Sequence, residues 1–318
     1  ILQFNENVIL SNDNLVVYLD SGGTAVISPF GPASVATGTY TIVGGQTSSD
    51  LDTTNLFLGS AVLRDEAGNT AGVLSIPAGH SLKDNSSIIV DTTDPTVTIN
   101  QAAGQGDPTN GAPISFTVIF SEDVTGFSTN GILIGGTAIP STISIQASNQ
   151  MNYTVYVGGM TGQGTVTAAV KAAAAYDYAG NSNIVSTSTD NIVIYDTIAP
   201  TGGLVDIESG ASATTNKTLS FAWGGFTDTV SMVDGYFHSF TNGQGTTNGT
   251  LVAAGVTNAS LPGAVLGTNW VYVWAKDNAG NIGTSVWDSI YVYNKAVSMS
   301  VSGLTAMVAG SNQVITVR

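Results

Sequence analysis

The chemical feature that recurs most in this sequence is the pattern Asp-x-Ala-Gly-Asn, in which one variable residue follows the aspartate. It occurs as "RDEAGN" at 64–69, "YDYAGN" at 176–181 and "KDNAGN" at 276–281. An aspartate that opens a turn accepts hydrogen bonds from backbone amides further along, glycine supplies a positive φ, and asparagine tolerates the same region. Each occurrence is therefore predicted to be a tight turn between two strands.

The same oxygens could also bind calcium, which takes six to eight oxygen ligands. Two of the turns are followed by a segment with further acids, "DTTDPTV" at 91–97 and "DTIAPTG" at 196–202. The candidate ligands form one group per segment: Asp65, Asn69, Asp91 and Asp94, then Asp177, Asn181 and Asp196. The sequence has no dense acidic loop of the D-x-D-x-D-G type, so a turn without metal remains the alternative. The third junction has Asn294 and Lys295 in place of the acid and proline, and is predicted to be metal-free.

Strands must position these turns. Short runs rich in Val, Ile, Thr and aromatic residues, such as "ISFTVIFSED" and "NWVYVWAKD", alternate between apolar and polar residues and are separated by Gly, Asn, Ser and Thr. The alanine-rich segment 167–177 lacks an amphipathic helical face and is also predicted to be a strand. Helix should make up less than about 5 % of the chain, well below the usual share.

The turns recur about every 100 residues, and such units of short strands favour β-sandwiches. The predicted fold is all-β, with tandem Ig-like sandwiches arranged as a rod. The boundaries are 1–91, 92–196 and 197–294, with a strand-forming tail over 295–318. The linkers at 91–95 and 196–200 should be short and extended, because a residue before proline avoids the helical region.

The combination of "ISFTVIFSEDVTGFSTNGILIGGTA", "GTVTAAVKAAAAYDYAGN" and "DTIAP" resembles the bacterial and archaeal Ig-like repeats of surface-layer proteins and large adhesins. The first unit is similar to the Ig-like repeats of surface-layer proteins, and the third is similar to a more aromatic Ig-like or fibronectin-like variant. The resemblance implies an extracellular location on the cell surface. It also implies calcium at domain junctions, since some members of the family bind it there.

Composition excludes several classes of function. Charged residues make up 9 % and hydrophobic residues 42 % of the chain, so it should fold. The chain has only seven Lys and Arg residues but 22 acidic residues, which gives a net charge of −15, so no nucleic-acid partner is expected. There is no cysteine, and no apolar run is long enough for direct membrane insertion.

Other candidate sites have simpler interpretations. His80 and His238 are expected at surface or turn positions rather than as a catalytic pair. The aromatic residues of the third unit could face a sugar but are expected in the core: Trp223, Phe226, Tyr236 and Phe237. A lysine isopeptide bond would need a buried lysine beside an acid, and the weak candidates are Lys171 and Lys276. Five glycosylation sequons begin at Asn85, Asn152, Asn216, Asn248 and Asn258.

The sequence contains no recognisable catalytic constellation, so it is predicted not to be an enzyme. The preferred function is a structural building block of an extracellular filament, fibre or surface layer. The alternatives are the stalk or tip of an adhesin that binds glycans, and an accessory segment of a secreted enzyme.

The two chain ends suggest how a homopolymer could form. "FNENV" at 4–8 aligns with "FSEDV" at 120–124, so the first unit lacks the roughly 25 residues that precede this strand in the second unit. The tail resembles the opening strands of such a domain. Inserting the tail of one copy into the first domain of the next would complete both by strand addition. The alternative is that these residues are one period of a longer continuous chain.

Overall fold

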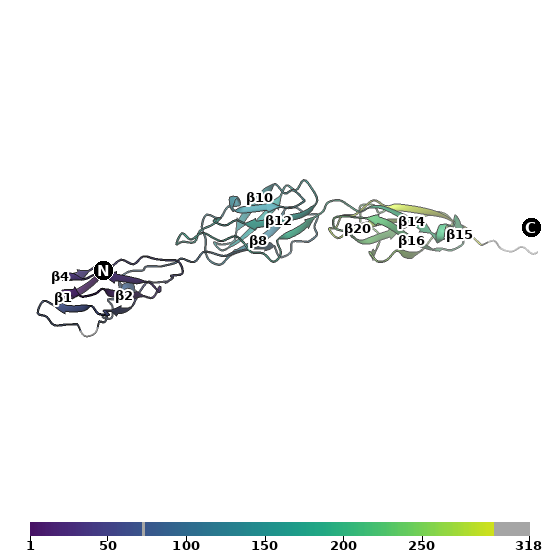
Figure 1. Ribbon diagram of the computed structural model, residues 1–318. Coiled ribbons are helices and arrows are strands. Elements are labelled where there is room, and N and C mark those ends of the chain that lie inside the picture. Colours follow the sequence, from purple (N-terminus) through teal and green to yellow (C-terminus); the bar gives the residue numbers. More distant parts are fainter. Residues whose placement is uncertain (72–73, 296–318) are drawn as a thin grey trace, which may run out of the picture. The chain divides into compact units, whose positions relative to one another are not determined.

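The computed structural model describes residues 1–71 and 74–295, and it is nearly all β. Strands make up 47 % and helix 3 % of the chain, which confirms the predicted fold class of tandem β-sandwiches. Three separate hydrophobic clusters form its cores. Figure 1 shows the strands that surround them. By its contacts the chain divides into two compact units, of which the first, Ile1–Asp196, holds two cores and the second, beginning at Thr197, holds one.

The first domain has two three-stranded sheets, ordered β4-β1-β6 and β3-β2-β5. Leu10, Leu15 and Leu63 are buried between these sheets, as the alternation of apolar and polar residues requires. The short helix α1 begins after Ser81, which caps it together with Asp84. The elements are β1 Leu2–Ser11, β2 Leu15–Leu19, β3 Thr24–Ile27, β4 Phe30–Ala36, β5 Thr53–Phe57, β6 Val62–Asp65 and α1 Leu82–Asn85.

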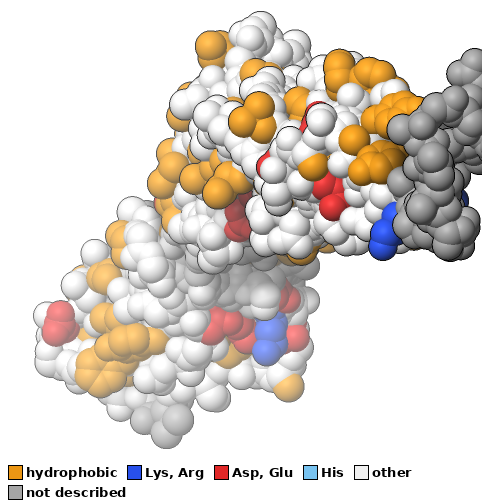
Figure 2. Space-filling view, turned by 90° about the vertical axis from the view of Figure 1, so that its right-hand side faces the viewer, with side chains coloured by type: hydrophobic (Ala, Val, Ile, Leu, Met, Phe, Trp, Pro, Cys, Tyr) orange, Lys and Arg blue, Asp and Glu red, His pale blue; other side chains and the backbone are white. Residues whose placement is uncertain are grey.

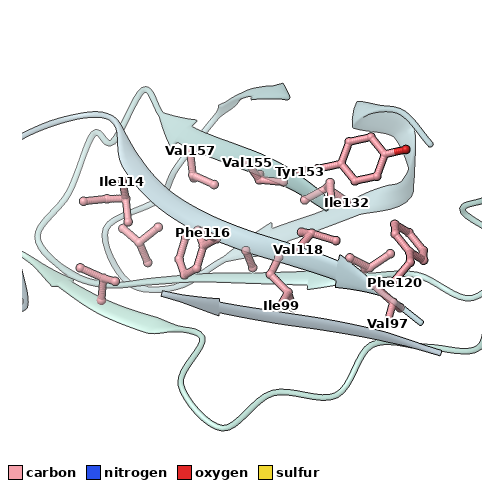
Figure 3. Packing of buried hydrophobic residues seen from close by; sticks show 14 of the residues in the cluster. Val97, Ile99, Ile114, Phe116, Val118, Phe120, Ile132, Tyr153, Val155 and Val157 are labelled. Carbon is pink, nitrogen blue, oxygen red and sulfur yellow. The ribbon is translucent and has the colours of Figure 1, made fainter. Parts of the chain in front are cut away.

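The second domain packs a four-stranded sheet, β10-β11-β8-β7, against a three-stranded sheet, β13-β12-β9. Its core is mainly aliphatic. Figure 3 shows Phe116, Val118 and Val155 among the side chains that fill it, and all three are fully buried. The elements are β7 Val97–Gln101, β8 Ile114–Phe120, η1 Thr129–Gly131, β9 Ile132–Gly135, β10 Thr142–Ala147, β11 Asn152–Gly158, β12 Gly164–Val170 and β13 Ile192–Tyr195.

The third domain packs the sheet β14-β16-β19 against the sheet β15-β21-β20-β17-β18. Aromatic side chains from both sheets meet in its core, where Phe221 and Trp223 contact Tyr236 and His238. The elements are β14 Thr201–Ile207, η2 Glu208–Gly210, β15 Ala213–Thr214, β16 Thr218–Thr227, β17 Val233–Ser239, β18 Thr250–Ala253, β19 Asn258–Pro262, β20 Gly267–Asp277 and β21 Val286–Val292.

The strand pairing supports the alignment of Phe4 with Phe120. In the first domain, Val8 pairs with the turn residue Asp65. In the second domain, Val124 aligns with Val8, and the residue after it, Thr125, pairs with Tyr176, the residue before the turn residue Asp177. In the second domain, Phe120 also pairs with Val97 of β7. In the first domain, among the residues that the structure describes, Leu2–Asn5 pairs with β4 on one side and has no strand in the position of β7.

The alanine-rich segment is a strand as far as Val170 and continues as a turn, so the strand prediction is correct for its first part only. Residues 91–95 and 196–200 have no regular secondary structure, as expected for linkers. The predicted tail lies outside the described residues, except for Lys295. Within the described part of the chain, no helix is long and apolar enough to cross a membrane.

Candidate calcium site at the repeated turns

The three Asp-x-Ala-Gly-Asn segments fold into the same hydrogen-bonded turn. In each, one aspartate oxygen accepts the backbone N–H of the asparagine at 2.7–2.8 Å, and the other accepts its side-chain amide at 2.6–2.8 Å. The aspartate N–H donates to the asparagine carbonyl at 2.9–3.1 Å. The glycine has φ of 93°, 95° and 97° in the three turns, which a residue with a side chain rarely adopts. The structure thus contains the predicted turns.

The turns differ in burial. Asp277 is fully buried and Asp177 is 5 % exposed, whereas Asp65 is half-buried. Burial raises the pKa of Asp177, but hydrogen bonds from Asn181 and from turn amides outweigh it and lower the pKa overall. At Asp65, the side-chain and backbone hydrogen bonds from Asn69 lower the pKa. Both carboxylates are therefore held in the ionised form.

One of the predicted ligands of the first group, Asp91, lies beside the turn of the following domain. Asp91, Glu122 and Asp177 each offer a carboxylate oxygen, and these three oxygens lie within 4.8 Å of one another. The Asn181 side-chain amide also donates to the Asp91 carbonyl at 3.2 Å, which ties the linker to the turn. Glu122, in the loop after β8, was missed in the sequence because its distance in the chain from both partners hides their proximity.

The electrostatics of this acidic group suit a cation. Burial raises the pKa of Glu122, and the negative charges of Asp91 and Asp177 raise it further. A divalent cation would reverse the repulsion between the three carboxylates. The donor set fits calcium in its chemistry, since it consists of oxygens alone. The number of oxygens that are available as ligands is incomplete, because both oxygens of Asp177 already accept hydrogen bonds from Asn181.

The remaining predicted ligands are placed elsewhere. Asp65 and Asn69 bond to each other and do not belong to the acidic group. Asp94 is exposed, and Asp196 is buried with its N–H bonded to the Thr109 carbonyl at 2.9 Å. The two predicted groups are therefore not assembled as grouped in the sequence.

In the third domain, Asp277 lies near a second carboxylate. Its oxygen and one from Asp228 lie within 4.8 Å of each other. One oxygen of Asp228 accepts three backbone N–H groups, from Val230, Ser231 and Met232. Asp228 therefore organises its own loop in the way that Asp277 organises its turn.

The histidines do not form a catalytic pair in the structure. His80 is exposed in the first domain. His238 is 4 % exposed and packs against the Phe221 and Trp223 rings, so the predicted surface position is wrong for this residue. Its position on the inner face of β17 is the reason, and burial lowers its pKa. The four aromatic residues predicted in the core are all buried: Trp223, Phe226, Tyr236 and Phe237.

The lysine and asparagine candidates are also located. Lys171 is exposed and donates to the Asn130 carbonyl, and Lys276 forms a partly exposed ion pair with Asp234 at 2.8 Å. Neither is the buried lysine that an isopeptide bond needs. Of the sequon asparagines, Asn152 is half-buried and four are exposed: Asn85, Asn216, Asn248 and Asn258.

Comparison with known proteins gives no family assignment. No family model matches the chain, and no curated protein matches it. The solved structures that match the chain include the fibronectin(III)-like modules of Clostridium thermocellum CbhA, at 11 % identity and a TM-score of 0.32, over 64 % of this chain and 100 % of that one. The N-terminal part of the bacterial S-layer protein SbsC matches at 16 % identity and a TM-score of 0.23, over 64 % of this chain and 45 % of that one.

A third similar structure is a Bacteroides ovatus protein, SGBP-B of the mixed-linkage glucan utilization locus, in complex with a mixed-linkage heptasaccharide. It matches at 14 % identity and a TM-score of 0.20, over 92 % of this chain and 65 % of that one. The present chain spans less than two thirds of the second and third of these structures.

Proposed function

We propose that this chain is a structural building block of an extracellular surface assembly, in which copies join head to tail by strand complementation. The observation that carries the proposal is the open edge of β1. In the second domain, β7 occupies the corresponding edge and buries Val97 and Ile99 in the core. In the first domain, Leu2 and Phe4 are only half-buried at this place, and Ile1 is 90 % exposed.

An added strand would satisfy both the backbone and the side chains of this edge. Unpaired N–H and C=O groups on a strand edge are a template for another strand. The segment proposed to occupy it is 296–318 of a neighbouring copy, whose "VITVR" end is rich in β-branched residues. Such a head-to-tail contact uses different surfaces on the two copies, so repeating it produces an open filament.

The test is to end the chain after Lys295 and to compare its assembly with that of the whole chain by electron microscopy. We expect the shortened chain to remain monomeric and a synthetic 296–318 peptide to bind it. Phe4→Lys should weaken binding of this peptide, while Glu6→Lys, at an exposed position of the same strand, should not. Circular dichroism of both variants would verify that they fold. Polymers of unchanged length from the shortened chain would refute the proposal, and would favour a preceding segment of a longer chain as the missing strand.

Calcium at the acidic group is part of this proposal. Asp91, Glu122 and Asp177 would hold the ion, which would supply positive charge between the linker and the turn of the second domain. Binding to the folded form alone stabilises it by mass action. Chelation should then lower the melting temperature, and Glu122→Gln should abolish the difference between calcium-loaded and chelated protein, with Glu66→Gln on the exposed part of the first turn as the control. Equal melting curves with calcium and with chelator would leave the aspartates only their role in the turns.

The proposal includes no catalytic role. The two histidines of the chain lie in different domains, and His238 is buried in a core. Exposed sequon asparagines at four positions would be accessible to glycosylation in an extracellular setting. Mass spectrometry of the native protein tests this. The adhesin alternative is favoured by one specific surface in the third domain.

A further inference from the structure

The outer face of the β20–β21 pair carries a row of uncovered aromatic rings. Along these strands, Val271, Val273 and Ile290 point into the core and are buried. The alternate positions therefore point outward, and cross-strand pairing places Tyr272 opposite Trp287, Trp270 opposite Ser289, and Thr268 opposite Tyr291. We call these six residues the aromatic face.

The rings of the aromatic face are accessible and fixed relative to one another. Trp270 is 40 %, Trp287 55 % and Tyr291 54 % exposed. The two indoles contact each other edge to face, with centroids 4.7 Å apart and an interplanar angle of 69°. Tyr291 lies four positions after Trp287, so these rings span about 13 Å along the strand. That length exceeds a single sugar ring.

The same sheet shows how an aromatic ring is covered when the fold buries it. Trp274, two residues beyond Tyr272, stacks on Phe237 and donates its indole N–H to the Thr246 carbonyl at 2.9 Å. The loop over it approaches through Gly243 and Gly249, where an added Cβ would lie 2.4 and 2.8 Å from the ring. Nothing comparable in the described part of the chain covers Trp270 and Trp287. The exposed rings are thus a separate feature of the sheet.

The chemical groups of the aromatic face indicate the class of ligand that it can bind. The face presents aromatic rings and hydroxyl groups, and it has no aliphatic side chain and no charge. Its neighbour Asp288 is directed away, since it accepts the Ile207 N–H, and Lys276 is neutralised by Asp234. Single-stranded nucleic acids also stack on aromatic rings, but the net charge of −15 repels their phosphates. Figure 2 shows acidic side chains and few basic ones on the visible surface.

We propose that the aromatic face binds a neutral oligosaccharide, whose C–H faces stack on the indole and phenol rings and whose hydroxyls bond to Thr268, Ser289 and the tyrosine hydroxyls. Ring faces carry negative partial charge, which attracts the polarised C–H groups of a sugar. The site is distinct from the edge of β1 that the proposed function uses. An assembly with this face would attach to neutral glycans on a surface.

The test is electrophoresis of the whole chain through gels that contain soluble neutral β-glucan, mannan or galactan, together with tryptophan fluorescence. All four tryptophans lie in the third domain, so the fluorescence reports on this domain alone. We expect at least one polysaccharide to retard the protein and to shift its emission. The double variant Trp270→Ala/Trp287→Ala should bind at least tenfold more weakly, and Trp270→Phe/Trp287→Phe should retain most of the binding.

The matched control is Leu204→Ala, which removes a 76 % exposed apolar side chain from the opposite sheet and should bind like the wild type. The emission of Trp223 and Trp274 would show that the double variant is folded. Wild-type protein that none of the three polysaccharides retards, or equal retardation of the double variant, would overturn the proposal. A loss of filaments in the double variant without any glycan effect would overturn it too, and would identify the face as an interface between copies.

Discussion

The cores of the second and third domains solve the same packing problem with different side chains. The second domain fills the space between its sheets mainly with aliphatic residues, and three rings, Phe120, Phe127 and Tyr153, close one end. The third domain places Trp223 and His238 in the centre, and their Nε1 and Nδ1 atoms are buried without a hydrogen-bond partner. A sandwich of this kind therefore tolerates polar ring atoms in its core, and for His238 the cost depends on pH.

The largest effect should come from the aliphatic core. Phe116→Ala removes a fully buried ring from β8 and leaves a cavity, so the free energy of unfolding of the second domain should fall by about 3–5 kcal/mol. Hydrogen exchange followed by mass spectrometry would locate the loss in peptides of 97–195. The exposed Leu133→Ala is the control. Protection that falls equally in the third domain would show that the two cores are not independent.

An intermediate effect is expected at the turn aspartates, because Asp277 is fully buried and Asp65 is half-buried. Asp277→Ala leaves the backbone and side-chain amides of Asn281 without their acceptor in a buried place, and should destabilise the third domain by about 1–3 kcal/mol. Asp65→Ala removes the same two hydrogen bonds from a more exposed turn, where water replaces the acceptor, and should have a smaller effect. Chemical denaturation of each variant would compare them. Equal losses would mean that the turn geometry, and not burial, sets the energy.

The smallest effect should be the pH dependence of the third domain. Burial lowers the pKa of His238 below its ordinary value of 6.5, so the unfolded chain binds a proton more readily than the folded domain. The stability due to the neutral ring is complete above pH 6.5 and is lost as the pH falls toward the folded pKa. Urea unfolding followed by tryptophan fluorescence at pH 7.5 and 5.5 would measure it. His238→Phe should remove the difference between these two pH values, and a difference that persists in this variant would assign it to other groups.

The sequence predicts much of the fold, because strand periodicity and turn chemistry are local. The strands around Phe116 and Trp274 and the turns at Asp65, Asp177 and Asp277 follow from a few neighbouring residues. Contacts across strands were not predictable in the same way. Glu122 joins Asp91 and Asp177 only through the fold, and Trp270 meets Trp287 only through the register of β20 and β21. His238 was misplaced because polarity alone suggested the surface, while its position on the strand determined its burial.

The three identical turns also fix the strand register beside them. A bridge closes each turn at the same offset, joining Arg64 to Thr70, Tyr176 to Ser182 and Lys276 to Ile282, although the third core is rich in aromatic residues and the other two are mainly aliphatic. The turn is thus a module whose geometry does not depend on its core. Gene duplication can lengthen such a chain while the core residues of each copy change. The six-residue turn keeps the strand register, and with it which residues point inward and which point outward.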